Sequence, residues 1–409
     1  MLARAEGSRL YDVDGREFLD GNSSWWVAAL GHRHPRLVRA LCEQAEVLGH
    51  TSLAGVTHAP AALLARDICA IAPHGLTRAF FSDDGSTAVE AALKIAVQFF
   101  AQNGRPEKKR FVALDGAFHG DTAGAVSLGG VEIFRRCFGP LLFDVVRVAS
   151  PAPDDDEGEE HAWQRAFADL EQILTDGAGE IAGVVVEPIV QGAAGMRSYD
   201  PRYLARLREL TLRLDVLLIA DEVFTGYGRT GPMWACSHAA IAPDLLCTAK
   251  GFSGGLLPMA ATLATERLYE GFSGGRGRAF LHGHSFTGNP LGAAVAREVL
   301  AIYRDEDVLG QVARKALVLR AAVEELRALP FVMRVRQIGM IAAADLATPT
   351  NEGYLGALGW RVYDEGLARG AYLRPLGDTV YLTPPLTISD EDLARLCSIL
   401  IASVKAAMH

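Results

Sequence analysis

The sequence is poor in cysteine and has no long apolar run, and both shortages exclude classes of protein. Its six cysteines are scattered over 409 residues without a CxxC pair, so no disulfide framework is expected. No stretch reaches the ~18 uninterrupted apolar residues of a membrane span. Residues 1–15 lack the apolar segment of a signal peptide. We therefore expect a soluble protein of the reducing cytoplasm, with no membrane partner.

Excess positive charge and metal-ligand spacing are missing as well. The chain has 40 Lys and Arg against 49 Asp and Glu, a net charge of −9, which does not favour a nucleic-acid partner. The eleven histidines include His32 with His34 and His282 with His284. Neither pair has helix-face metal spacing or a carboxylate close by in the sequence, so no metal site is expected.

Short apolar runs alternate with helical periodicity through the first part of the chain. The runs 78–81, 110–114, 181–188 and 216–222 predict strands, and the apolar residues of 87–100 recur at three- and four-residue steps. Strands that alternate with helices are typical of an α/β fold with a mostly parallel sheet. Because the strand runs are almost continuously apolar, both faces of this sheet should be covered.

The two ends of the chain have a different pattern. From residue 290 to about 329 the periodicity is helical, and short β-like runs and a closing helix at 390–408 follow. Near the N-terminus, 8–20 reads as a hairpin with Asp14 and Gly15 at its turn. Such a hairpin needs a surface to pack on, and the C-terminal region is the candidate.

The length of 409 residues fits two domains, since ~100–200 residues per domain is usual. We predict a large α/β domain over 23–304. A smaller α+β domain would be formed by 1–22 together with 305–409.

Lys250 stands in an unusual place, between the apolar run 245–249 and the glycine-rich 251–255. A lysine held away from water loses part of its preference for the ammonium form and becomes a usable amine nucleophile. Asp221 ends the apolar run VLLIAD, and a buried carboxylate needs a cationic or hydrogen-bonding partner. The pair fits a structural ion pair or a site for pyridoxal 5′-phosphate (PLP), in which the lysine forms a Schiff base and the carboxylate faces the ring nitrogen.

Gly85 and Ser86 open the helix predicted after the strand at 78–81. The first turn of a helix has free backbone N–H groups and favours a negative charge, so it could bind a phosphate. The same residues also fit an ordinary helix cap.

The stretch 186–263 resembles class III PLP-dependent aminotransferases along its whole length. The segments DEVFTGYGRTG at 221–231 and TAKG at 248–251 are highly specific for that class. The resemblance extends over nearly the whole chain and includes DGNSSWWVAALGHRHP at 20–35 and HGHSFTGNPLGAAVA at 282–296. It implies a homodimeric fold-type I transferase with PLP as cofactor.

The resemblance also implies a role for particular residues. Lys250 would hold the cofactor and move the substrate proton, and Asp221 would bind the ring nitrogen. The other cofactor-binding residues would be Gly85, Ser86 and Phe118, with His284 and Ser285 contributed across the dimer. The substrate-binding residues would be Trp25, Phe118, Lys250, Gly283 and Arg374, where a planar guanidinium suits a carboxylate.

Other residues stay ambiguous in the sequence. Trp25 and Trp26 fit a hydrophobic core as well as a substrate site. Arg229 could brace the fold or touch substrate, and His119 is more often a loop histidine with its hydrogen bonds made than an acid or base.

Within the class, the chain is similar to the members that act in biotin biosynthesis. This implies transfer of the amino group of S-adenosyl-L-methionine to 7-keto-8-aminopelargonate. The alternatives are an ω-aminotransferase that uses lysine or another amine, and an aminomutase of the same fold.

Two departures from those members affect substrate recognition. They have an N-terminal segment with an HPYT-like element, and this sequence starts after its place. Their ring-stacking tyrosine is Phe118 here.

Overall fold

Seven strands form the central sheet of the computed structural model, which describes residues 1–154, 157–347 and 353–408. In spatial order they are β4 (Leu76–Ser82), β12 (Ala260–Thr265), β11 (Leu245–Thr248), β10 (Leu217–Asp221), β7 (Ile181–Val186), β5 (Arg110–Leu114) and β6 (Val146–Val148). The five strands from β11 to β6 are mutually parallel. Only β12 runs antiparallel to its neighbours β11 and β4. The predicted α/β fold with a mostly parallel sheet is confirmed.

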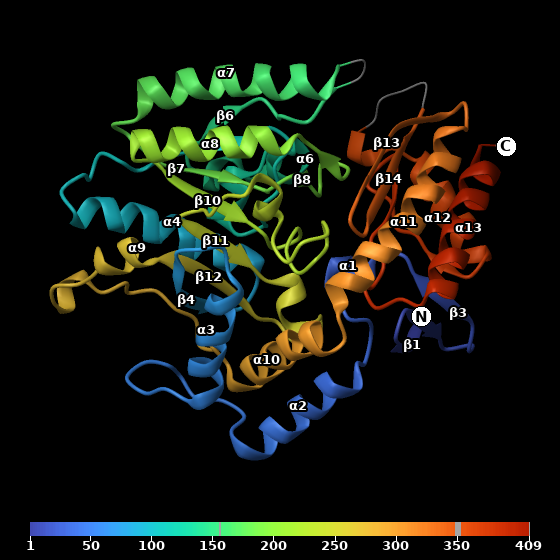
Figure 1. Ribbon diagram of the computed structural model, residues 1–409, viewed down its shortest axis with the longest axis horizontal. Coiled ribbons are helices and arrows are strands. Elements are labelled where there is room, and N and C mark those ends of the chain that lie inside the picture. The colour runs from blue at the N-terminus through green and yellow to red at the C-terminus, as the bar shows by residue number, and fades with distance from the viewer. Residues whose placement is uncertain (155–156, 348–352, 409) are drawn as a thin grey trace.

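Helices cover both faces of this sheet, as its apolar strands require (Figure 1). Along β10, Leu217 and Ile219 pack on the side of α4 (Gly85–Gln102). Leu218 and Ala220 pack on the side of α7 (Glu159–Gly177) and α8 (Pro201–Leu214). Because successive side chains of a strand point to opposite faces, a strand buried on both faces is apolar throughout.

Local signals set where several helices begin. Asp200 accepts a hydrogen bond from the N–H of Arg202 ahead of α8, and proline occupies the first position of that helix. Asn289 and a following proline start α10 (Pro290–Asp305) in the same way. Proline is favoured there because the first N–H groups of a helix have no partner within it.

The remaining helices surround this core. α2 (Pro35–Val47) and α3 (Ala59–Ile71) pack on α10 below the sheet in Figure 1. Shorter helices are α1 (Ser23–Trp26), α5 (Ala123–Leu128), α6 (Glu132–Arg135) and α9 (Glu266–Glu270). A two-stranded ribbon joins β8 (Val190–Gln191) to β9 (Arg197–Ser198).

Two further sheets are built only from the ends of the chain. β13 (Val332–Ile338), β14 (Ile341–Leu346) and β16 (Thr379–Leu382) form one of them. β1 (Leu2–Glu6), β2 (Arg9–Asp12), β3 (Glu17–Asp20) and β15 (Ala371–Tyr372) form the other. α11 (Val308–Arg327), α12 (Leu358–Ala368) and α13 (Asp390–Ala407) pack with them. The hairpin predicted at 8–20 is confirmed, and its partner is C-terminal, because β15 pairs with β3.

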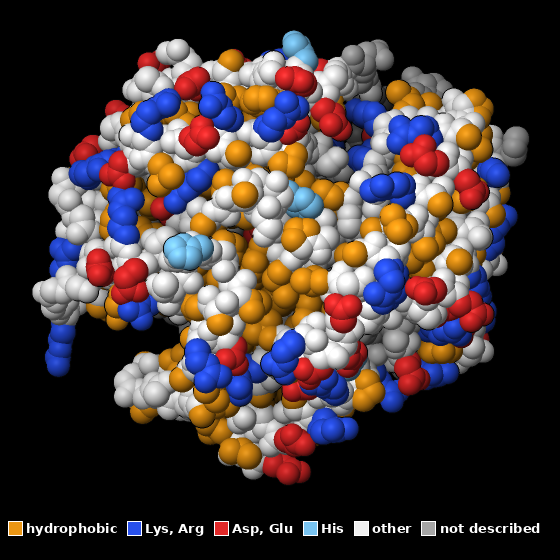
Figure 2. Space-filling view, in the orientation of Figure 1, with side chains coloured by type: hydrophobic (Ala, Val, Ile, Leu, Met, Phe, Trp, Pro, Cys, Tyr) orange, Lys and Arg blue, Asp and Glu red, His pale blue; other side chains and the backbone are white. Residues whose placement is uncertain are grey.

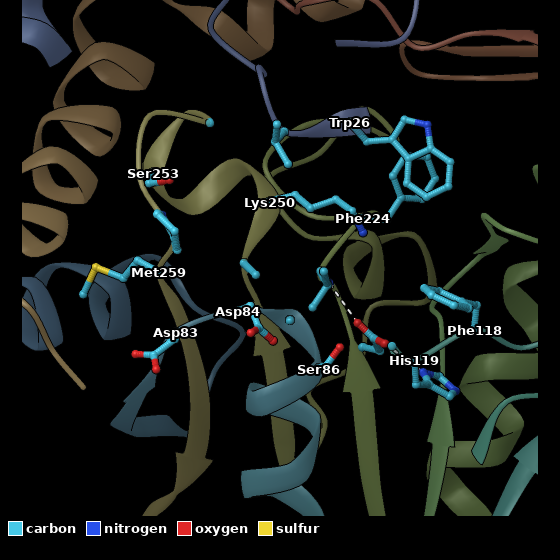
Figure 3. A pocket seen from close by; sticks show the side chains of 18 of the residues that line it. Trp26, Asp83, Asp84, Ser86, Phe118, His119, Phe224, Lys250, Ser253 and Met259 are labelled. Atoms are coloured by element: carbon cyan, nitrogen blue, oxygen red, sulfur yellow. Dashed lines mark hydrogen bonds and ion pairs between the residues drawn. The ribbon is translucent and has the colours of Figure 1, made fainter. Parts of the chain in front are cut away.

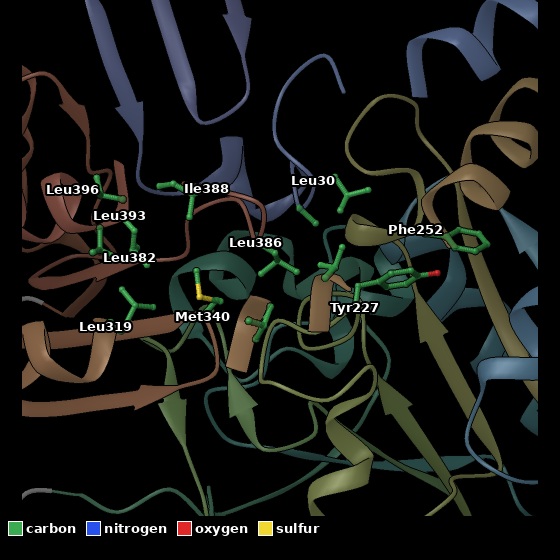
Figure 4. Packing of buried hydrophobic residues seen from close by; sticks show 14 of the residues in the cluster. Leu30, Tyr227, Phe252, Leu319, Met340, Leu382, Leu386, Ile388, Leu393 and Leu396 are labelled. Atoms are coloured by element: carbon green, nitrogen blue, oxygen red, sulfur yellow. The ribbon is translucent and has the colours of Figure 1, made fainter. Parts of the chain in front are cut away.

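The hydrophobic core continues across the predicted domain boundary. Leu30 and Phe252 belong to the same buried cluster as Met340 and Leu386 (Figure 4). The division at residues 22 and 304 follows which strands share a sheet, and it stays a prediction.

Asp392 fastens the N-terminal hairpin to the first turn of α13. Its carboxylate is 6% exposed and accepts hydrogen bonds from Ser8 Oγ at 2.9 Å and from Arg9 Nη2 at 2.7 Å. A carboxylate buried in this way depends on these donors, since it has given up its hydration.

We expect Asp392→Ala to lower the free energy of unfolding by about 1–3 kcal/mol, because hydrogen bonds to a charged group are lost and Arg9 stays partly solvated. Urea unfolding measures this change. Glu391→Ala is the matched control, since Glu391 is exposed in the same helical turn. Equal losses in the two variants would contradict the role of Asp392.

Candidate active site

A cavity of about 430 Å³ opens at the carboxyl edge of the central sheet. Glu187, Asp221 and Lys250 reach it from the ends of β7, β10 and β11, and Lys250 is labelled in Figure 3. Phe118 and His119 line it from the loop after β5. Ligands of open α/β sheets bind at this edge, since the loops after parallel strands meet there.

On the outer surface, hydrophobic side chains gather near the centre of the face shown in Figure 2.

Lys250 lies just beyond β11, in a short 3₁₀ turn over Lys250–Ser253. Burial lowers the pKa of its amine, and the charges of Asp221 and Glu187 oppose that shift. A lowered pKa leaves more of the amine neutral near pH 7 and thus able to accept a proton or attack a carbonyl. The turn therefore presents to the cavity a lysine whose pKa lies below its ordinary value.

Lys108 and Lys315 are buried, whereas Lys250 is half-buried, and their contacts differ from those of Lys250. Lys108 Nζ donates to two backbone carbonyl oxygens at 2.7 Å each. Lys315 Nζ donates to a backbone carbonyl at 2.8 Å and to an amide oxygen at 2.9 Å. Burial lowers the pKa of each amine to about 8. Neither lysine lines the cavity, so both serve the fold, whereas Lys250 faces the cavity.

His119 orients the carboxylate of Asp221. Its Nδ1 lies 2.7 Å from Asp221 Oδ2, and the backbone N–H of Val223 donates to Oδ1 at 3.0 Å. Both side chains are buried, at 3% and 5% exposed. The sequence suggested only a loop histidine, whereas the structure places His119 in contact with the predicted ring-binding carboxylate.

Glu187 joins two loops beside the cavity. The backbone N–H of Phe118 donates to Oε1 at 3.0 Å, and that of Gly192 donates to Oε2 at 2.9 Å. Burial raises the pKa of this carboxyl to about 7. Glu187 therefore fixes the backbone that presents the ring of Phe118; its place at the end of an apolar strand run indicated a site residue, but not these two partners.

The start of α4 forms the opposite wall. Asp84 caps the helix by accepting a hydrogen bond from the N–H of Thr87 at 2.9 Å. As the first residues of an 18-residue helix, Gly85 and Ser86 have N–H groups without an intrahelical partner. A Cβ atom at Gly85 would lie 2.7 Å from a methyl group of Val223, so glycine is required for this close approach. The wall suits an anionic group such as a phosphate.

The two tryptophans occupy different positions. Trp26 is buried and lines the cavity, whereas Trp25 is 49% exposed and is not among the lining residues. The guanidinium of Arg374 lies over the ring of Trp25, with its Cζ 3.9 Å from the ring centroid. The structure thus brings the predicted substrate-binding residues Trp25 and Arg374 together, although neither lines the cavity itself.

Gly283, His284 and Ser285 lie outside this cavity. His284 Nδ1 is 3.1 Å from Oδ2 of Asp83, which lines the cavity. Their expected contribution to the site of a second subunit stays a prediction.

Arg229 braces the fold. It is fully buried and donates to the backbone carbonyls of Pro384 at 2.8 Å and Met340 at 3.2 Å. These bonds join the segment after β10 to the C-terminal region.

The donors and acceptors around the cavity fit one kind of ligand. An oriented carboxylate suits a cationic ring nitrogen, an aromatic side chain suits a flat ring, and a helix start suits an anion. A lysine amine can form a covalent bond with a carbonyl carbon of the same ligand.

Comparisons with known proteins point the same way. A family model described as aminotransferase class-III matches residues 1–404. An adenosylmethionine-8-amino-7-oxononanoate aminotransferase of Synechococcus elongatus is 46% identical over 396 residues, which cover 96% of this chain and 92% of that protein. The enzyme with this name from Geobacter sulfurreducens is 41% identical over 403 residues, with coverages of 96% and 89%.

Solved structures agree closely with the fold. The adenosylmethionine-8-amino-7-oxononanoate aminotransferase of Methanocaldococcus jannaschii has a TM-score of 0.92 at 33% identity, covering 99% of this chain and 93% of its own. An omega transaminase of Pseudomonas jessenii in complex with PMP has a TM-score of 0.94 at 28% identity, with coverages of 100% and 92%.

The raised pKa of Glu187 predicts a pH-dependent stability. The pKa of about 7 lies above the ordinary 4.5, so the folded protein binds more protons between these values. Its contribution to stability is therefore complete below about pH 4.5 and is lost as the pH rises through about 7. Between pH 5 and pH 8, the free energy of unfolding of the protein without cofactor should fall by about 1–3 kcal/mol more than that of the Glu187→Gln variant.

Urea unfolding of both proteins at several pH values measures this difference. Glu180→Gln is the control, because Glu180 is an exposed carboxylate just before β7. Parallel pH profiles for the natural protein and Glu187→Gln would show that burial does not perturb Glu187.

Proposed function

Since the chain belongs to the class III aminotransferases, we propose that it uses PLP to aminate 8-amino-7-oxononanoate, also called 7-keto-8-aminopelargonate. The amino donor would be S-adenosyl-L-methionine and the product 7,8-diaminopelargonate, an intermediate of biotin biosynthesis. The observation that carries this proposal is that Lys250 lines one cavity at the sheet edge with Asp221, whose carboxylate is oriented by His119. Relatives whose names specify this donor and acceptor, matched over nearly the whole chain, support the choice of substrates.

The residues around the cavity would hold the cofactor by distinct groups. Bound PLP supplies an aldehyde carbon and an electron-withdrawing ring that stabilises negative charge on the neighbouring carbon. Gly85 and Ser86 would bind its phosphate through backbone N–H groups. Asp221 would face the ring nitrogen, with His119 fixing the carboxylate, and Phe118 would stack on the ring.

Lys250 Nζ would carry the proton in each half of the reaction. A neutral amine can remove a proton from the donor's α-carbon and later return one to the acceptor's carbon. Such general base catalysis typically contributes 10²–10⁴-fold to rate. Burial makes the neutral form available, while Asp221 and Glu187 allow the ammonium to form.

The rim would recognise the substrates. Arg374 would bind a substrate carboxylate through its planar guanidinium. Trp25 and Gly283 would line the path of the substrate chain, and Trp26 would keep water from the Lys250 amine.

We further propose a homodimer in the cytoplasm. His284 and Ser285 would then reach the phosphate bound by the second subunit, as expected from the sequence. The cytoplasm suits the six cysteines, none of which forms a disulfide in the described residues. Among the helices of residues 1–154, 157–347 and 353–408, none is both long and apolar enough to cross a membrane.

A second candidate is an ω-aminotransferase with another amine donor. The close fit to an omega transaminase fold supports it, as does Phe118 in place of the tyrosine of the biotin enzymes.

Single half-reactions separate these functions. The PLP-loaded protein should lose its visible cofactor absorbance faster with S-adenosyl-L-methionine than with lysine or a simple ω-amine, because we propose that the site binds S-adenosyl-L-methionine as its amino donor. Lys250→Ala should not turn over repeatedly, whereas Lys405→Ala, which removes an exposed lysine of α13, should behave as the natural protein.

Faster reaction with lysine or an ω-amine would overturn the donor and favour the second candidate. Failure of all these donors to change the spectrum would overturn the aminotransferase proposal itself.

A further inference from the structure

The indole of Trp26 covers the amine of Lys250. The Lys250 Nζ atom lies 5.1 Å from the centroid of the Trp26 ring. Phe224 packs on the same indole, with ring centroids 4.6 Å apart. Figure 3 shows the lysine chain ending beside these two rings. At this distance, a desolvated ammonium is attracted to the negative face of an aromatic ring.

The chain conformation that presents Trp26 is strained. Ser23, Ser24, Trp25 and Trp26 have φ angles of 47°, 45°, 69° and 72°, in the left-handed region. A left-handed helical conformation costs roughly 1–2 kcal/mol per L-residue. Such strain persists where the surroundings over-determine it, and it is concentrated at functional sites.

The segment after β16 holds this turn in place. Ser23 Oγ donates to the carbonyl of Thr383 at 2.6 Å. The backbone N–H of Thr383 donates to the carbonyl of Gly21 at 2.8 Å, and that of Leu386 donates to the carbonyl of Ala29 at 2.8 Å. The turn is therefore bonded on both sides to one segment of the C-terminal region.

Tyr381 fixes the indole itself. This residue of β16 is 4% exposed, and its hydroxyl accepts a hydrogen bond from Trp26 Nε1 at 3.1 Å. The two rings also meet edge to face, with centroids 6.2 Å apart. An indole N–H buried without an acceptor is costly, so this bond selects one orientation of the ring.

We propose that Trp26 is a positioning residue, which holds the amine of Lys250 by its ring face, and that Tyr381 anchors Trp26 for this purpose. The contact belongs to the chain itself, and its value for transamination rests on the function proposed above. Five other titratable side chains line the same cavity: Asp221 on β10, Glu187 after β7, His119 after β5, and Asp83 and Asp84 between β4 and α4. The aromatic face favours the ammonium without adding a negative charge, and it opposes the effect of burial.

A pair of substitutions isolates the aromatic face. Trp26→Phe and Trp26→Leu both remove the indole N–H and both shrink the side chain, but only phenylalanine keeps a ring face. The readout is the rate at which acetic anhydride acetylates Lys250, measured by mass spectrometry on the full chain without PLP at several pH values. The midpoint is the pH at which this rate is half of its maximum. The midpoint should be about 0.4–1.5 pH units lower in the leucine variant, because its ammonium loses the cation–π contact.

Equal midpoints, or a lower midpoint in the phenylalanine variant, would contradict the proposal that the ring face of Trp26 holds the amine of Lys250. This assay needs neither donor nor acceptor, so its failure is distinguishable from failure of the proposed function. Circular dichroism confirms that both variants are folded.

A coupling experiment tests the anchor. Tyr381→Phe should lower the Lys250 midpoint by less than Trp26→Leu does, because a free indole spends less time over the amine. In a Trp26→Phe background the same change should have no effect, since the N–H donor is already gone. Tyr303→Phe is the matched control: its buried hydroxyl donates to the carbonyl of Tyr227 at 2.7 Å, outside the cavity lining.

The control should lower the melting temperature and leave the Lys250 midpoint unchanged. An unchanged or raised midpoint in Tyr381→Phe, or equal effects in both backgrounds, would overturn the anchoring role of Tyr381.

Discussion

The amine of Lys250 lies half-buried in the cavity at the carboxyl edge of a parallel sheet, and the proposed chemistry of the site depends on that placement. Burial favours the neutral amine and has the larger effect on its pKa, whereas the charges of Asp221 and Glu187 favour the ammonium. Both forms of the amine are needed by a group that accepts and then returns a proton.

The neighbouring carboxylates are themselves fixed by the strand ends. Asp221 is bound by His119 from the loop after β5, and Glu187 is bound by backbone N–H groups of two loops. The parallel order of β5, β7 and β10 brings these groups to one edge. Tyr381 of the C-terminal region accepts a hydrogen bond from Trp26, whose ring lies beside the Lys250 amine. Both parts of the chain therefore contribute to the environment of one amine.

The sequence predicted the elements whose cause is local. The run 110–114 is β5, and the apolar periodicity that begins near residue 87 lies within α4. The positions of Lys250 and Asp221 at the ends of apolar runs also predicted that they share a site, and both line one cavity. The role of His119 depends on two loops far apart in the chain, and four consecutive left-handed residues at 23–26 oppose every local preference. Such features arise from tertiary packing, and no periodicity or motif in the sequence predicts them.

The central claim is that Lys250, and neither Lys108 nor Lys315, bonds to the cofactor. Borohydride reduction of the PLP-loaded protein, followed by digestion and mass spectrometry, tests it directly. The account predicts the cofactor's mass on the peptide that contains Lys250, because Lys250 lines the cavity and the buried Lys108 and Lys315 do not. Attachment at Lys108 or Lys315, or at no lysine, would contradict it.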